Sequence, residues 1–152
     1  MSRRWANRVV GWGEVAPDQL LANPFNARRH PAAQRDALRG SLNELDIIAP
    51  VIVNRTTNRL VDGHARVEEF ISAGVELVPV AYVELSEAEE KLALLSLDPI
   101  GAMAEYDSAQ LEELIGEIPD VDSGLSAALD GLVGKSAERQ LVCPACGATW
   151  QP

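Results

Sequence analysis

The sequence lacks several features that would assign a class of protein directly. Its 152 residues contain no apolar run of about 18 residues, so no segment is expected to span a membrane. The only two cysteines lie within Cys143-Pro-Ala-Cys146, which argues against a disulfide framework and agrees with a reducing compartment. The first residues carry positive charge without a following apolar segment. We therefore expect no secretory signal and a cytoplasmic location.

Motifs of several common enzyme classes are also missing. The sequence has no Gly-x-x-x-x-Gly-Lys-Ser/Thr phosphate loop, no Gly-x-Ser-x-Gly nucleophile motif and no His-Glu-x-x-His zinc motif. Both cysteines lie near the end of the chain, which disfavours a cysteine nucleophile.

What the sequence does contain is a strand, a glycine turn and a helix between Asn58 and Gly74. The turn is Asp62-Gly63, and the helix is predicted to begin at His64. The first N–H groups of a helix have no intrahelical acceptor, and the helix dipole favours negative charge there. This connection is therefore a candidate phosphate or anion site, although on spacing alone an ordinary structural connection is the favoured interpretation. Three apolar residues are predicted to pack this helix on a sheet: Val67, Phe70 and Ile71.

Four side chains of this segment could carry chemistry. Arg66 has a planar donor fork suited to phosphate oxygens, and His64 could act as a general acid or base near neutral pH. Asp62 and Glu69 are candidate ligands of a divalent ion. The alternative is that Asp62 forms the turn and that Glu69 lies on a solvated helix face.

A family resemblance adds to this interpretation. Leu60-Val61-Asp62-Gly63-His64-Ala65-Arg66 resembles the Gly-x-x-Arg box of the ParB/sulfiredoxin-like superfamily, whose phage and mobile-element members often read Asp-Gly-His-His-Arg here. The other boxes follow in the matching order: Asn23-Pro24, Asn26-Ala27-Arg28, Pro50-Val51-Ile52-Val53 and Val78-Pro79-Val80. The resemblance covers about residues 17–118. Residues 97–105 also resemble the methylase-associated type.

The resemblance implies an α+β fold, with a small mixed sheet and packed helices followed by C-terminal helices and a cysteine tail. It implies a phosphate or nucleotide site at Gly63, His64, Ala65 and Arg66, with Arg28 as a second clamp. Two positions at this site depart from the family pattern. His64 stands where sulfiredoxins carry their reactive cysteine, and Ala65 stands where many relatives have a second histidine or an arginine.

We expect four parts in the chain: an N-terminal arm (1–16), the core (17–97), a helical extension (98–133), and a linker with the cysteine tail (134–152). The arm is predicted to be weakly ordered or an edge strand. Its tryptophans and arginines could grip single-stranded nucleic acid, but packing of the tryptophans on their own domain is the favoured interpretation.

Helix signals divide the rest of the chain. Leu38, Leu42 and Leu45 predict a helix with Pro31 at its first position, whose stripe faces the core. Ser86-Glu87-Ala88-Glu89 predicts a capping box, with the helix broken at Asp98-Pro99. Further helices are predicted from Asp107 or Ser108 to Pro119 and over 125–132.

Charge is distributed unevenly, although the net charge is −10. Residues 1–40 hold seven arginines against three acids, a balance of +4. Residues 84–132 hold thirteen acids against Lys91 alone, a balance of −12. A polyanion would therefore be drawn to the N-terminal third.

Cys143 and Cys146 have the form of a zinc knuckle, which supplies two of the four ligands that structural zinc needs. The other candidate ligands of this type are His30 and His64, and the latter would then leave the anion site. Three outcomes are open: two chains share one zinc ion, the site binds zinc weakly, or the motif holds no metal.

Two functions from different classes follow. The first is a ParB-like enzyme acting on DNA or nucleotides, a nuclease or a nucleotide-dependent phosphotransferase, with Mg or Mn as cofactor and a role in phage or mobile-element DNA metabolism. The second is a non-catalytic nucleotide- or DNA-sensing adaptor for a partner such as a DNA-modification enzyme or a second copy. The first is slightly favoured, because a histidine in the phosphate-facing turn has no obvious structural use. A ParB-type helix-turn-helix would need more chain than follows the core, so sequence-specific partition is not expected.

Overall fold

The computed structural model describes residues 5–138, 141–142 and 149–150, with side chains described for residues 5–134. These residues form two compact units that do not follow the order of the sequence. The first unit combines the segment up to His30 with Ile47–Ala102, and the second combines Pro31–Asp46 with the chain from Met103 onward.

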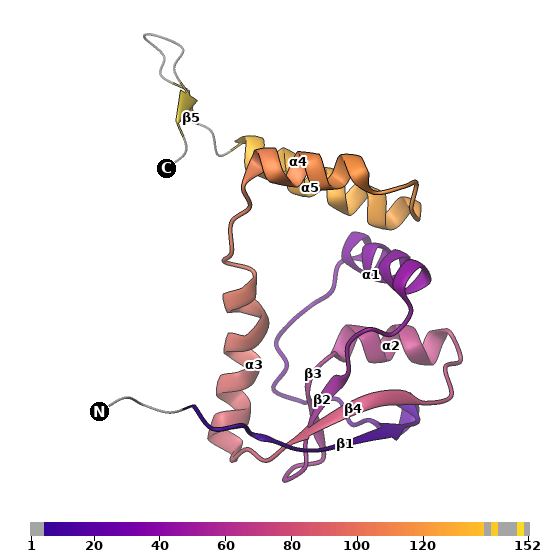
Figure 1. Cartoon of the computed structure of the whole chain (residues 1–152). Helices are drawn as coiled ribbons and strands as arrows, with labels where there is room; N and C mark the ends of the chain where they lie inside the picture. Colours follow the sequence, from indigo (N-terminus) through magenta and orange to yellow (C-terminus); the bar gives the residue numbers. More distant parts are fainter. Residues whose placement is uncertain (1–4, 139–140, 143–148, 151–152) are drawn as a thin grey trace. The chain divides into compact units, whose positions relative to one another are not determined.

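The first unit is built on a mixed sheet with the strand order β1-β4-β2-β3 (Figure 1). Strands β2 and β4 are parallel, whereas β1 pairs with β4 and β3 pairs with β2 in the antiparallel sense. The predicted α+β fold with a small mixed sheet and packed helices is confirmed. The bounds of its elements are β1 (Val9–Val15), the 3₁₀ turn η1 (Pro17–Gln19), β2 (Val51–Asn54), β3 (Arg59–Asp62), α2 (His64–Ser72), β4 (Val78–Val83) and α3 (Glu87–Gly101).

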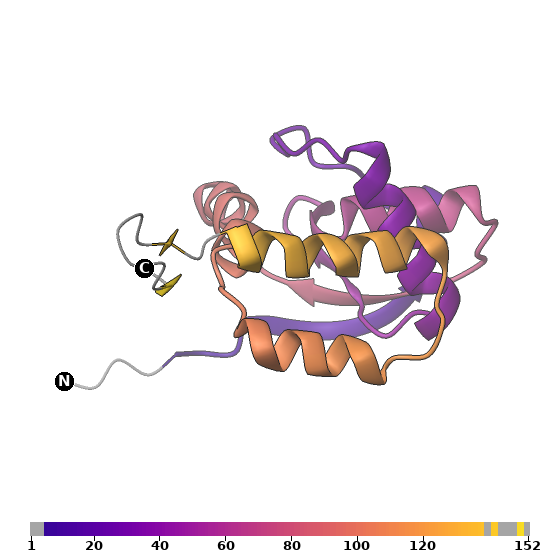
Figure 2. The same ribbon diagram turned by 90° about the horizontal axis from the view of Figure 1, so that it is seen from above.

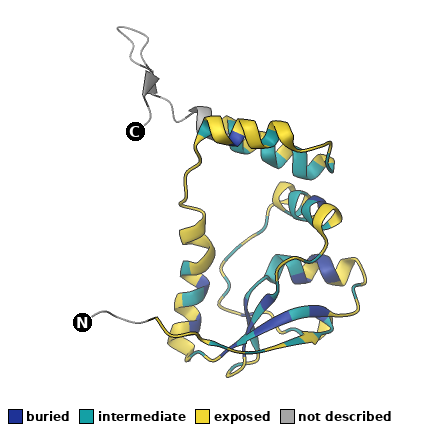
Figure 3. Cartoon of the chain, in the orientation of Figure 1, coloured by how far each residue is buried: buried dark blue, intermediate teal, exposed yellow. Residues whose placement is uncertain are grey.

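The core of this unit lies on the two central strands, where Val51, Val78 and Val80 are 0% exposed. Helix α2 adds the buried side chains of Val67 and Phe70, as the dark blue segments of Figure 3 show. The prediction for Ile71 is wrong, because its side chain is 49% exposed. Glu69 is buried in its place. The apolar spacing therefore predicted the buried face of α2 correctly but not which residues lie at the margin of that face.

Strand β1 confirms the edge-strand alternative for the arm, since it pairs on one side only, with β4. Side chains alternate between the two faces of a strand, and Trp12 falls on the open face, where it is 70% exposed. Trp5, before the strand, is 95% exposed. The expectation that the arm packs these two tryptophans on its own domain is therefore wrong.

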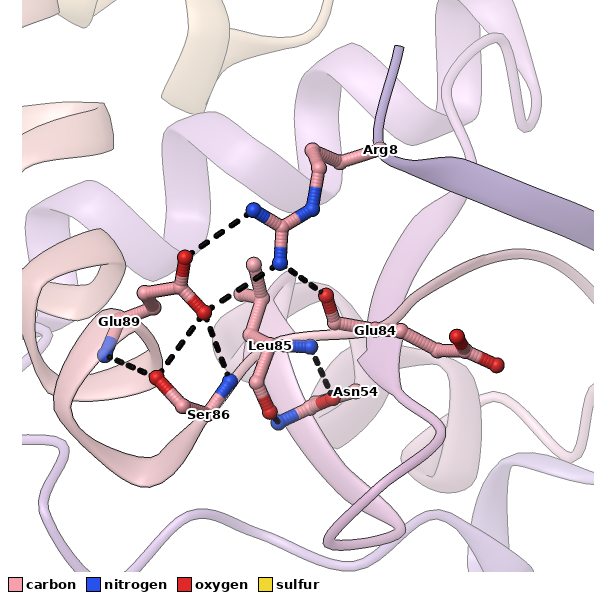
Figure 4. A network of polar contacts seen from close by, with 6 residues as sticks. All are labelled: Arg8, Asn54, Glu84, Leu85, Ser86 and Glu89. Atoms are coloured by element: carbon pink, nitrogen blue, oxygen red, sulfur yellow. Dashed lines mark hydrogen bonds and ion pairs between the residues drawn. The ribbon is translucent and has the colours of Figure 1, made fainter. Parts of the chain in front are cut away.

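The N-terminal end of α3 is fixed by the predicted capping box, in which Ser86 and Glu89 satisfy each other's backbone N–H groups. Arg8, just before β1, donates to both carboxylate oxygens of Glu89 and to the Glu84 carbonyl (Figure 4). The hydrogen bonds from Arg8 and Ser86 lower the pKa of the Glu89 carboxyl to about 2. One carboxylate therefore caps the helix and holds the beginning of β1.

The second unit consists of α1 (Ala32–Leu45), α4 (Ser108–Glu117) and α5 (Ser123–Glu138), with α1 and α4 each packed against α5. Figure 2 shows α4 and α5 running alongside each other. The cap at Asp107 is confirmed, since its side chain accepts from the Gln110 N–H. Helix α5 is longer than the predicted 125–132. Leu45 is 52% exposed, so the stripe predicted on α1 is incomplete.

Two short strands, β5 (Leu141–Val142) and β6 (Thr149–Trp150), pair antiparallel. Cys143 and Cys146 lie outside the described residues, so the zinc knuckle remains a prediction. Among the residues that are described, no helix combines the length and hydropathy that crossing a bilayer requires.

Gly40 allows α1 to approach α5 closely, and its replacement tests that packing. A Cβ at Gly40 would lie 2.6 Å from Asp122 Oδ1 and 2.9 Å from Leu125 Cβ. We expect Gly40→Ala to lower the free energy of unfolding by about 1–3 kcal/mol through overpacking. Gly131→Ala in α5 is the matched control, because a Cβ there meets nothing within 4 Å. The control should gain about 1 kcal/mol from helix propensity. Denaturation followed by circular dichroism measures both, and equal stability of the two variants would contradict the packing described.

Candidate anion-binding site

The N-terminus of α2 is formed by a glycine that no other residue could replace without strain. Gly63 is the N-cap and has φ +96, the left-handed region that disfavours side chains. A Cβ at this position would also lie 2.6 Å from Val51 Cγ1. The predicted glycine turn is therefore both a backbone requirement and a close approach of α2 to β2.

The first turn of α2 leaves backbone donors available. The first intrahelical bond runs from the Val67 N–H to the Gly63 carbonyl, 2.9 Å apart. No side chain among the described residues caps this helix end. The N–H groups of His64, Ala65 and Arg66 thus precede the first intrahelical bond, in a region where the helix dipole favours an anion. The helix predicted to begin at His64 is therefore present, and its use as a phosphate site stays a prediction.

Arg66 is engaged within the protein. Its Nη1 donates to the carbonyls of Ala49 (2.8 Å) and Pro50 (3.0 Å), and its Nη2 donates to Asp62 Oδ2 at 2.7 Å. The guanidinium therefore links the residues just before β2 to Asp62 at the end of β3. Phosphate binding through its fork remains a prediction, and it would require some of these bonds to be exchanged.

Asp62 forms an ion pair with Arg66, and both side chains are largely shielded from solvent, at 23% and 20% exposed. The pair compensates the negative charge that Asp62 would otherwise place beside the α2 N-terminus. The predicted role of Asp62 as a metal ligand would compete with this pairing.

His64 lies at the first position of α2, with its ring held from outside the helix. The backbone N–H of Asn23 donates to His64 Nε2 at 3.2 Å. Burial lowers the pKa of His64, and Arg28 and His30 lower it further, whereas Asp62 and Glu68 act in the opposite direction. A histidine with a lowered pKa is neutral at pH 7.

Arg28, the predicted second clamp, binds the C-terminal part of α3. Its Nη2 donates to the Leu94 carbonyl at 3.1 Å, and its Nη1 pairs with Asp98. These contacts lie beside Pro99, where the helix was predicted to break; that prediction is wrong, because α3 continues to Gly101. A cation is favourable near the end of a helix, and Arg28 supplies one where α3 has no basic residue of its own. Arg28 also lies near enough to His64 to lower its pKa.

A buried carboxylate is hydrogen-bonded to Asn23, and it was not predicted from the sequence. Glu90 on α3 is 0% exposed. Its oxygens accept from Asn23 Nδ2 (2.8 Å), from Asn54 Nδ2 (2.5 Å) and from the Thr57 hydroxyl. Burial raises the pKa of Glu90, but the bonds from Thr57, Asn54 and Asn23 outweigh it, so the pKa is lowered overall. Glu90 is thus an ionised group inside the first unit.

Asn54 carries the network on to the connection before α3. Its Oδ1 accepts from the Leu85 N–H and its Nδ2 donates to the Leu85 carbonyl, both at 3.0 Å, as Figure 4 shows. The one signal in the sequence was an asparagine at the end of the apolar run Val51-Ile52-Val53. A polar residue that ends a buried strand needs a partner, but the sequence does not say which.

The predicted metal sites are not assembled in the described part of the chain. Within it, no group of three or more His, Cys, Asp or Glu side chains could hold a metal ion. Glu69 is buried at 4% exposure, so it does not lie on a solvated face. The catalytic set of His64, Asp62 and Glu69 remains a prediction.

The steric role of Gly63 can be separated from its backbone role. We expect Gly63→Ala to lower the free energy of unfolding by about 3 kcal/mol or more, because a positive φ and a clash with Val51 act together. Gly74→Ala is the matched control, since φ there is +70 and a Cβ would meet nothing within 4 Å. It should lose about 1–2 kcal/mol. Urea denaturation compares the two, and equal losses would contradict the close approach of α2 to β2.

Comparison with known proteins supports the architecture. No protein-family model matches the sequence, and no curated protein matches it either. Among solved structures, the C-terminally truncated chromosome-partitioning protein ParB from Caulobacter crescentus, complexed with CTP-γ-S, is similar with a TM-score of 0.50 and 24% identity. The match covers 69% of this chain and 63% of that one.

Two structures of the N-domain of a pNOB8-like ParB are similar as well. One has a TM-score of 0.51 at 19% identity and covers 93% of this chain; the other has a TM-score of 0.52 at 17% identity and covers 99%. The matches cover 56% of each of those chains. At these identities the similarity concerns the fold: the chain has the fold of ParB N-terminal domains.

Proposed function

We propose that this chain is a ParB-like nucleotide-binding module that holds the phosphates of a nucleoside triphosphate at the N-terminus of α2. The observation that carries the proposal is the uncapped first turn after Gly63, where three backbone N–H groups precede the first intrahelical bond. One protein of similar fold is complexed with CTP-γ-S, which makes CTP the first ligand to test.

The charges around this turn favour an anion. Arg28 and His30 both act on His64 at the first position of the helix, and Arg66 lies two residues further on. The nearest acid in the sequence, Asp62, is compensated by Arg66 at 2.7 Å. A bound phosphate would therefore face backbone donors beside the compensated Asp62–Arg66 pair, with Arg28 near His64.

The same contacts favour binding over hydrolysis. In the enzyme hypothesis Asp62 holds a divalent ion and Arg66 the phosphate, but these two side chains are bonded to each other. Nuclease or nucleotide-hydrolysing activity is the second candidate, supported by His64, whose other ring nitrogen could exchange a proton. DNA is the alternative polyanion, attracted by the arginines at positions 3–39.

A substitution at Ala65 tests the proposed phosphate site at the N-terminus of α2 without disturbing the fold. An acid in the first turn stabilises a helix but repels a bound phosphate. We expect Ala65→Asp to weaken CTP binding at least about tenfold, which corresponds to one charge-assisted hydrogen bond, with no loss of thermal stability. Ala65→Asn introduces a side chain of the same size as aspartate without the charge, and this variant should bind CTP with an affinity within about threefold of the wild type. Isothermal titration calorimetry at low salt, with and without magnesium, measures each affinity.

The same preparations distinguish the candidates. Binding of CTP without release of phosphate or cleavage of labelled DNA supports the binding module. Turnover that is lost in His64→Ala, with binding retained, supports the enzyme. Equal affinity of Ala65→Asp and Ala65→Asn would place the ligand elsewhere, and no binding of CTP, another nucleoside triphosphate or DNA would refute the proposal.

A further inference from the structure

We propose that Glu90 is a positioning residue for the anion seat: through Asn23 it holds His64 as a neutral imidazole with its proton on Nδ1. His64 would then offer the ligand an N–H donor instead of a base. The last step rests on the proposed function, whereas the arrangement of Glu90, Asn23 and His64 does not.

The state of His64 follows from one hydrogen bond. A backbone N–H can only donate, so the bond from Asn23 to His64 Nε2 requires a lone pair on that nitrogen. In a neutral imidazole the other nitrogen then carries the proton. Protonation of both nitrogens would break this bond and leave the Asn23 N–H without its acceptor.

Asn23 itself is held at both ends of its side chain. Its Nδ2 donates to Glu90 Oε1 at 2.8 Å, and its Oδ1 accepts from the Phe25 N–H at 3.0 Å. The residue is 4% exposed, so water could not easily replace either partner. Because the Asn23 side chain is fixed in this way, its backbone N–H is fixed as well. The direction of the hydrogen bond from this N–H to His64 Nε2 is therefore set.

Glu90 can serve as the anchor because it is ionised. It accepts hydrogen bonds from Asn23, Asn54 and Thr57 and donates none of them, which suits a carboxylate and not a carboxylic acid. These donors come from three places in the chain: the loop before α1, the end of β2 and the turn before β3. Glu90 thereby joins the loop that carries Asn23 to the sheet.

The surroundings of His64 are consistent with the neutral form. Arg28 and His30 disfavour a positive charge on the ring, and burial has the largest effect in the same direction. Asp62 and Glu68 favour the charge, but Asp62 is paired with Arg66. Binding of a dianionic phosphate would favour protonation of His64, and the bond from Asn23 opposes it.

Nuclear magnetic resonance reads the state of the ring directly. The chain has only two histidines, so His30 is an internal reference and long-range ¹⁵N–¹H correlations assign the tautomer of His64. In the wild type at pH 7 we expect the Nδ1–H form. In Asn23→Ala and in Glu90→Leu we expect a mixture of tautomers, with the pKa of His64 moving up towards its ordinary value. CTP affinity should fall about tenfold in both variants, the equivalent of one hydrogen bond.

Thr57→Val is the matched control, because it removes a hydrogen bond to the same carboxylate but not the link to Asn23. It should lose stability yet keep the wild-type tautomer. An Nε2–H wild type would overturn the proposal, as would a tautomer unchanged in Asn23→Ala; both readings hold even if Glu90→Leu does not fold. If CTP fails to bind while the tautomers behave as expected, the proposed function fails and the positioning of His64 by Glu90 stands.

Discussion

The hydrogen bonding of one buried carboxylate is the constraint on which the first unit depends. Burying a charge without partners costs more free energy than most single interactions return, so Glu90 can be 0% exposed only where donors surround it. Its donors, Asn23, Asn54 and Thr57, come from segments that are distant in the sequence. The position of α3 against the β2–β3 hairpin and the course of the loop before α1 are therefore set together. The N-terminus of α2 is joined to the same network through the bond from Asn23 to His64.

Local elements could be predicted from the sequence because their evidence lies within a few residues. The glycine turn at Gly63 and the capping box at Ser86 depend on backbone groups close along the chain, and both are found as predicted. The apolar stripe on α1 predicts a covered face but does not identify the element that covers it, which is α5, and it does not reveal that Leu45 stays 52% exposed. Pro99 was predicted to break the helix because proline lacks the N–H that bonds the carbonyl four residues earlier. The contacts of Arg28 with the Leu94 carbonyl and with Asp98 span 66 and 70 positions, so they could not be found locally.

The same difference between local and long-range evidence applies to the candidate site. Gly63, Ala65 and Arg66 are neighbours in the sequence, so the turn alone brings them together. The family resemblance proposed them as site residues without any knowledge of the packing, and their role stays a prediction. Glu90 was hidden, because its bonds to Asn23 and Asn54 span 67 and 36 residues. In the sequence it is one acid among thirteen in residues 84–132, most of which are solvated. Nothing local distinguishes an acid that will be buried from one that will not, since the difference lies in donors supplied by other segments.

The arrangement at α2 separates the donors available to an anion from the side chains that shape the site. Arg66 and Asp62 satisfy each other and hold the ends of β2 and β3, so their charges serve the scaffold. The donors that would be left for a ligand are the backbone N–H groups and, in the proposed tautomer, the Nδ1–H of His64. The backbone donors would be present whichever side chains stand at positions 64 and 65, so His64 and Ala65 set the further chemistry offered to a ligand. What the proposed site does require is the left-handed turn at Gly63, which forms the N-cap of α2.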